Sequence, residues 1–162
     1  MPRAFPMLLV LAALLSSPRL VTAQDNVAPF QTSGAFFALS VPDVAVSARW
    51  YREKLGLKVI LEPPRSSDAS VIILEGGGLI VELLQHNAAK PLHTIAPDVR
   101  ENYKVHGFFK SGLIVEDFDR TLAALRARGV EIAMGPFPKS ATQRANVIVR
   151  DNAGNLIQFF GK

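Results

Sequence analysis

The chain contains no cysteine among its 162 residues. This absence excludes disulfides, thiolate metal ligands, a cysteine nucleophile and the attachment of a lipid to an N-terminal cysteine. Histidine is also scarce, with three residues in the chain. The motifs HExxH and GxSxG and the spacing of an EF-hand loop do not occur. The sequence therefore offers no support for a zincin, an α/β-hydrolase or an EF-hand protein.

Long hydrophobic runs are missing as well. The longest apolar run, residues 7–15, covers nine residues, far fewer than the ~20 that span a bilayer as a helix. Arg3 precedes this run and Val21-Thr22-Ala23 follows it, which is the pattern of a cleaved signal peptide. We predict a signal peptide over residues 1–23, with an uncleaved anchor as the alternative, and export to the periplasm or the outside of the cell.

The predicted mature chain, residues 24–162, carries little net charge. It has 139 residues, and the loss of Arg3 and Arg19 leaves 16 basic against 14 acidic side chains, a net charge of +2. These charges form no lysine–arginine stripe of the kind that nucleic-acid-binding proteins show. We expect one compact domain that binds no nucleic acid and does not insert stably into a membrane after cleavage.

Hydrophobic periodicity predicts one strand, one helix and three strands, twice over. In the first copy, the strands are 35–41, 57–62, 71–74 and 79–85, and the helix is capped by Asp43 and ends at Gly56. In the second copy, the strands are 111–115, 130–133, 146–150 and 156–160, and the helix is capped by Asp117 and ends at Gly129. Overlaying the copies pairs Val41 with Val115, Asp43 with Asp117, Gly56 with Gly129 and Glu82 with Gln158, at offsets of 74, 74, 73 and 76 residues.

Offsets this steady indicate an internal duplication. We therefore predict an α+β fold of two tandem βαβββ modules. Residues 24–34 are a leader, and the domain covers residues 35–162. Module one is 35–86, the connection is 87–109, and module two is 110–161.

Several stretches resemble the vicinal oxygen chelate superfamily, which contains glyoxalases, bleomycin-resistance proteins and dioxygenases. These are residues 39–43 (LSVPD), 50–57 (WYREKLGL), 122–130 (LAALRARGV) and 150–157 (RDNAGNLI). The resemblance implies two tandem modules that form a shared concave cleft, often completed in a homodimer. Metal-dependent members hold one divalent ion there, with ligands on the first and last strand of each module.

The resemblance places those ligand positions at Phe36, Glu82, Lys110 and Gln158. Glu82 is a natural ligand and Gln158 a weak one, whereas a phenyl ring has no donor atom and an ammonium group repels a cation. We expect no metal or other cofactor; if one divalent ion binds, Glu82 and Gln158 hold it. The expected ligand-binding residues are Phe36, Glu82, Lys110, Gln158 and Phe160.

Glu82 interrupts an apolar run, residues 79–84, that predicts a strand covered on both faces. One interpretation pairs Glu82 with Lys110 in place of a metal, and the other leaves both side chains solvated. Strand alternation puts His86 on the face of Glu82, so Glu82 and His86 are the candidate catalytic residues, although a surface histidine that closes a strand is the alternative for His86.

Three functions remain open. The first is an exported protein that binds a small, largely apolar organic ligand in a cleft with a degenerate metal site. The second is a glyoxalase-like lyase or isomerase, or a dioxygenase, that acts on a small molecule with Glu82 as base or metal ligand. The third is a non-catalytic interaction module.

Overall fold

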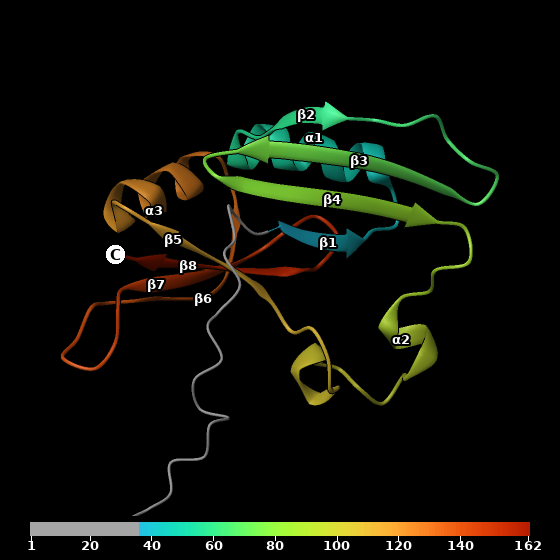
Figure 1. The fold of residues 1–162 in the computed structure, drawn as a ribbon. Helices are drawn as coiled ribbons and strands as arrows, with labels where there is room; N and C mark the ends of the chain where they lie inside the picture. Colours follow the sequence, from blue (N-terminus) through green and yellow to red (C-terminus); the bar gives the residue numbers. More distant parts are fainter. Residues whose placement is uncertain (1–35) are drawn as a thin grey trace, which may run out of the picture. The chain divides into compact units, whose positions relative to one another are not determined.

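The structure, a computed structural model, describes residues 36–162, so the predicted signal peptide and leader lie outside the described residues. Figure 1 shows two copies of one unit, the first in blue to green and the second in orange to red. The first copy comprises β1 (Phe36–Ser40), α1 (Val44–Trp50), the π-helical turn η2 (Tyr51–Leu55), β2 (Lys58–Leu61), β3 (Ala69–Gly76) and β4 (Leu79–His86). The connection contains α2 (Leu92–Ile95) and a 3-10 turn, η3 (Asn102–Lys104). The second copy comprises β5 (Ser111–Val115), α3 (Phe118–Ala127), β6 (Glu131–Phe137), β7 (Asn146–Arg150) and β8 (Leu156–Gly161).

Each copy forms its own four-stranded mixed sheet. The strand orders are β1-β4-β3-β2 and β5-β8-β7-β6, and in each sheet the first strand runs parallel to the last. The register repeats as well, because Phe37 pairs with Val81 in one sheet and Ser111 with Ile157 in the other. These pairs differ by the offsets 74 and 76 found in the sequence. The predicted α+β fold of two tandem βαβββ modules is therefore confirmed.

Both long helices begin at the predicted aspartates. Asp43 Oδ1 accepts hydrogen bonds of 2.9 Å from the backbone N–H groups of Ala45 and Val46. Asp117 Oδ1 accepts one of 2.9 Å from the N–H of Arg120. The first N–H groups of a helix have no partner within the helix, so these carboxylates satisfy donors that would otherwise be left to water.

The helices end beside each other in a symmetric contact. Gly56 and Gly129 adopt the left-handed conformation, with φ of 77° and 64°, which a side chain would disfavour. Just before them, Arg128 Nη1 donates to the carbonyl of Lys54 at 2.9 Å, and Lys54 Nζ donates back to the carbonyl of Arg128. The two residues are 74 positions apart, so residue and duplicate exchange the same contact. This reciprocity is the mark of a twofold relation between the modules.

A buried junction joins helix α1 and η2 of module one to the β7–β8 turn of module two. The Tyr51 hydroxyl donates to Asp151 Oδ2 at 3.0 Å, and Asn152 Nδ2 donates to Ser47 Oγ at 3.1 Å. Tyr51 is fully buried. Burial and the adjacent carboxylate both raise the pKa of the Tyr51 phenol far above its usual value, because each disfavours the phenolate.

One hydrophobic core spans both modules. One face of each sheet turns towards it, through alternate residues of the strands. The core residues from β4 and β8 are Leu79, Val81, Leu83, Ile157 and Phe159. Leu122 and Leu125 of α3 and Val44 and Ala48 of α1 complete it from the helices.

The structure differs from the predicted elements mainly in length. β3 and β6 extend beyond the predicted 71–74 and 130–133, because the hairpin partners continue to pair after the apolar runs end. The connection also contains two short helical turns that the sequence did not indicate. Within residues 36–162, no helix is long and apolar enough to cross a membrane.

Candidate ligand-binding site

The second face of each sheet turns away from the core. Side chains alternate between the two faces along a strand, and paired residues on neighbouring strands lie on the same face. The residues between the core residues, together with their partners, therefore form the outward face. We call these two surfaces the open sheet faces. In module one the open sheet face comprises Phe36, Ala38, Val71, Ile73, Ile80, Glu82 and Leu84, and in module two it comprises Gly112, Ile114, Met134, Phe137, Asn146, Ile148, Leu156, Gln158 and Phe160. The same faces also carry the polar residues Ser40, Glu75, Glu131 and Arg150.

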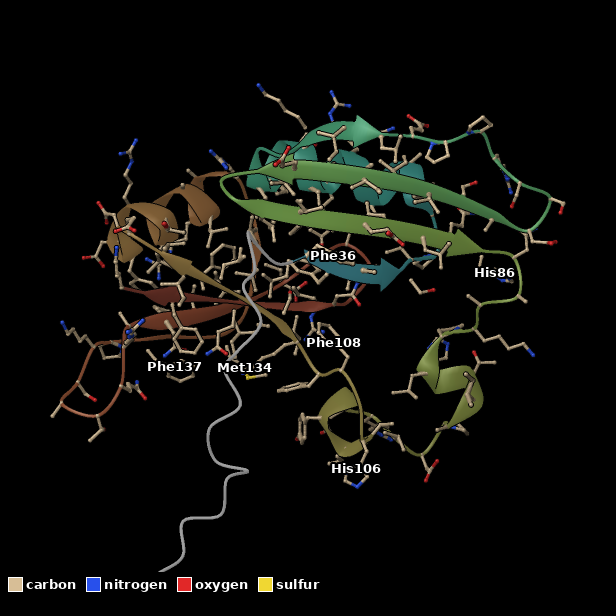
Figure 2. The ribbon with its side chains drawn as sticks, viewed as in Figure 1. Phe36, His86, His106, Phe108, Met134 and Phe137 are labelled. Atoms are coloured by element: carbon tan, nitrogen blue, oxygen red, sulfur yellow. The ribbon has the colours of Figure 1, made fainter. Side chains whose placement is uncertain are left out.

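The open sheet faces carry several large apolar side chains that are strongly exposed. Phe36 and Ile114 are 66% and 68% exposed, and Met134 is 37% exposed. Figure 2 shows Phe36 on β1, Phe108 on the segment that enters β5, and Met134 and Phe137 on β6. Single exposed apolar residues are ordinary, but a group of large ones on one kind of surface indicates a binding surface.

Glu82 lies in the middle of the module-one open face. It is half-buried, with Ala38 and Ile73 as its neighbours on β1 and β3. The prediction that the strand is covered on both faces is wrong, since Leu79, Val81 and Leu83 are buried but Glu82 and its neighbours Ile80 and Leu84 are only half-buried. No side-chain oxygen in the described part of the chain is buried without a partner, so the Glu82 carboxylate reaches solvent.

Lys110 does not pair with Glu82, so the interpretation of a charged pair is wrong. Within residues 36–162 the salt bridges join other side chains, none of them Glu82 or Lys110. Lys110 Nζ instead lies 5.2 Å from the centre of the Phe109 ring, a cation–π contact. The residue precedes β5, where the backbone can turn its long side chain away from the sheet.

Gln158 is held in the module-two open face by a second amide. Its Nε2 donates to Asn146 Oδ1 at 2.9 Å, and both side chains are almost fully buried. Sequence analysis did not identify Asn146. The signal was available, because the predicted β7–β8 hairpin places Asn146 opposite Phe160 and on the face of Gln158. This amide pair supplies a donor and an acceptor on an otherwise apolar surface.

The four positions that correspond to metal ligands do not line one common pocket. Phe36 and Lys110 line a groove of about 900 Å³ between the modules, whereas Glu82 and Gln158 do not. One carboxylate, one amide engaged with Asn146, a phenyl ring and an ammonium group are not a donor set for a divalent cation. Within residues 36–162, no group of three or more histidine, aspartate or glutamate side chains could hold a metal ion. The residues present do not fit the ion.

The three histidines lie away from the centres of the two open sheet faces. His86 ends β4, is exposed, and accepts a 3.1 Å hydrogen bond at Nδ1 from the N–H of Ala88. It shares the face of Glu82, as predicted, but four residues along a strand separate them by about 13 Å. His93 and His106 are exposed in the connection, and Figure 2 shows His106 in a loop apart from His86. No histidine therefore stands within reach of Glu82.

Comparison with known proteins gives the family. The family model described as Glyoxalase/Bleomycin resistance protein/Dioxygenase superfamily matches residues 35–159. The two-module fold and this match together show that the chain belongs to that superfamily. No functionally curated protein matches the sequence.

Several solved structures share the fold at low sequence identity. A glyoxylase/bleomycin resistance protein/dioxygenase domain from Frankia sp. EAN1pec has 21% identity and a TM-score of 0.61, over 82% of this chain and 98% of that one. TnmS3, an antibiotic binding protein from Streptomyces sp. CB03234, has 19% identity and a TM-score of 0.58, over 83% and 98%. The trypanothione-dependent glyoxalase I of Leishmania major has 19% identity and a TM-score of 0.55, over 78% and 84%. At these identities the likeness shows the fold alone.

Proposed function

We propose that this chain is an exported binding protein that holds a small, largely apolar organic ligand on its open sheet faces without a metal. The observation that carries the proposal is the composition of those faces: large apolar side chains surround a short polar set, Glu82 and the Gln158–Asn146 amide pair. Binding sites for small molecules commonly combine apolar walls with a few fixed polar groups. The antibiotic binding protein from Streptomyces sp. CB03234 with the same fold supports this class of function.

The test of binding is a thermal-stability screen of the purified protein against small aromatic compounds and antibiotics. A compound that binds the native state raises the melting temperature, and the stabilisation grows with the logarithm of its concentration over Kd. Met134→Gln places a polar group on the open sheet face and should weaken binding of any hit. Ile95→Gln is the matched control, because Ile95 is an exposed apolar residue of α2 outside those faces. Equal loss of affinity in both variants would refute the proposed site.

Independence from metal follows from the donor set at Phe36, Glu82, Lys110 and Gln158. We expect elemental analysis of protein purified without chelator to find no stoichiometric zinc, iron, nickel or manganese. We also expect ligand affinity to survive treatment with EDTA. Stoichiometric metal that is lost in Glu82→Gln would support a metalloenzyme instead.

A second candidate function is a metal-free lyase or isomerase with Glu82 as base. The observation in its favour is the half-buried carboxylate, which has no hydrogen-bond or ion-pair partner within residues 36–162 and stands among apolar side chains. A base of this kind can take a proton from a bound carbon acid. Solvent deuterium exchange into a ligand found by the screen tests it, with Glu82→Gln as the inactive variant.

Export and pairing belong to the same proposal. Residues 1–23 direct export, and a second copy of the chain covers the open sheet faces to exclude water from the ligand. The exposed apolar side chains Phe36, Ile114 and Met134 support the pairing.

A further inference from the structure

The twofold relation between the modules creates two equivalent junctions, and only one of them is filled. In the first junction, η2 and the β7–β8 turn meet through Tyr51 and Asp151, and Tyr51 is fully buried. In the second junction, α3 faces the β3–β4 turn. The residue 74 positions after Tyr51 is Leu125, which carries no hydroxyl, and the turn consists of Gly77 and Gly78, which follow Gly76 at the end of β3.

Because the glycine turn has no side chains, the second junction stays open. A Cβ atom added at Gly77 or Gly78 would have nothing within 4 Å. The groove of about 900 Å³ lies here, lined by the glycine turn, by Leu125 and Ala124 of α3, and by the whole of β5. Its size is that of ligand sites in general, which run to ~300–1,000 Å³. It is separate from the polar centres of the open sheet faces, since Glu82 and Gln158 are not among its lining residues.

The lining of the groove combines an apolar floor with positive charge. Leu57, Leu113 and Phe159 contribute to the floor. The cationic side chains that line it are Lys54, Lys110, Arg120 and Arg128. Across the described residues, Arg120 has no side-chain hydrogen bond or ion pair, and Lys110 has only its contact with Phe109.

The two acidic lining residues each have a hydrogen-bond partner. Lys162 Nζ donates to Glu116 at 2.9 Å, and the backbone N–H of Arg120 donates to Asp117. With four cationic and two acidic side chains along its lining, the groove carries an excess of positive charge beside apolar surface. Such a site favours a ligand with an apolar body and one anionic group.

We propose that this groove between the modules binds an amphipathic organic anion, such as a medium-chain or aromatic carboxylate. The apolar body lies along β5 and α3, and the carboxylate lies at the rim near Arg120. The groove shares Phe36, Gly112 and Ile114 with the open sheet faces but none of their polar groups. Its ligand is therefore a second one, and a failure to bind decanoate would leave the ligand proposed for Glu82 and the Gln158–Asn146 pair untouched.

The experiment titrates the protein with sodium decanoate and, separately, with 1-decanol, followed by methyl NMR and calorimetry. Decanoate should shift the methyl signals of Leu113 and Leu125 and leave Met134 unaffected. It should bind more weakly in high salt, because salt screens charge at the rim. Decanol should bind with little dependence on salt.

Two pairs of variants on α3 locate the site. Ala124→Phe fills the groove and should weaken decanoate binding by more than about tenfold, whereas Ala123→Phe, on an exposed position outside the lining, should not. Arg120→Gln should weaken decanoate but not decanol, and Arg126→Gln, exposed and outside the lining, should weaken neither. Should Ala124→Phe fail to fold, the Arg120 pair decides alone. Absence of decanoate binding, shifts confined to Met134, or equal effects within each pair would overturn the proposal.

Discussion

At the scale of single residues, the position of Lys110 decides whether Glu82 has an ion-pair partner. Its ammonium group lies against the Phe109 ring, and the described residues form no ion pair between Lys110 and Glu82. Removing one partner of a buried ion pair costs ~3–5 kcal/mol, but solvated charges are worth ~0–1 kcal/mol. Glu82 and Lys110 are not paired, so they belong with the solvated charges.

We therefore expect Glu82→Gln and Lys110→Met each to change the free energy of unfolding by less than about 1 kcal/mol. The double variant should equal the sum of the single ones, because the two side chains do not interact. Urea unfolding of the four proteins in a double-mutant cycle measures this. A coupling energy above about 1 kcal/mol would show that the two side chains form a pair in solution.

Tyr51 is the residue on which the contact between modules depends most. Tyr51→Phe removes the hydrogen bond to Asp151 while keeping the ring in the core, and should lower the free energy of unfolding by about 1.5–3 kcal/mol. Tyr103→Phe is the matched control, because Tyr103 is 55% exposed, and should be close to neutral. Equal stabilities in urea for the two variants would contradict the role of the hydroxyl.

The same phenol makes stability depend on alkaline pH. Burial and Asp151 raise the pKa of Tyr51 in the folded protein, so the folded state keeps its proton where the unfolded chain ionises. The protonated phenol of Tyr51 therefore adds to the free energy of unfolding. This contribution is fully present below the usual tyrosine pKa of about 10 and is lost as pH rises above that value. Urea unfolding between about pH 8 and about pH 11 should show a steeper decline in the wild type than in Tyr51→Phe. Parallel profiles would refute the assignment.

At the scale of elements, the two aspartate caps differ in how many donors they satisfy. Asp43 accepts from two backbone N–H groups and Asp117 from one. Replacing a capping residue by alanine costs about 0.5–2 kcal/mol. We expect Asp43→Ala to cost more than Asp117→Ala, with asparagine restoring most of each loss. Asp119→Ala, in the first turn of α3 without such a role, is the control, and thermal unfolding is the measurement.

The elements were largely predictable because their signals are local. The caps at Asp43 and Asp117 and the glycine stops at Gly56 and Gly129 act within one helical turn, and all four were read from sequence. The extra length of β3 and β6 was not predictable in this way. It comes from pairing with the neighbouring strand, which no local pattern records.

At the scale of the whole molecule, the exposed apolar side chains of the open sheet faces predict association of two copies. Sedimentation equilibrium should give twice the mass of one chain. Met134→Glu should shift the equilibrium towards the single chain, because a charge buried in an apolar interface is costly. Ile95→Glu, on the equally apolar but separate surface of α2, should leave the mass unchanged. A single-chain mass for the wild type would show that the faces remain open.

The sequence by itself determined the duplication, the element order, the helix boundaries and the four positions Phe36, Glu82, Lys110 and Gln158. The duplication, element order and helix boundaries follow from periodicity, capping and a constant offset, which are properties of neighbouring residues and of repeats. The four positions are what the resemblance to the superfamily implies. Tertiary structure alone decided that Lys110 turns to Phe109, that Asn146 holds Gln158, and that one junction is filled by Tyr51 while its duplicate is a groove. Those outcomes depend on which side chains meet across sheets and modules, and such contacts arise only when the whole chain has packed.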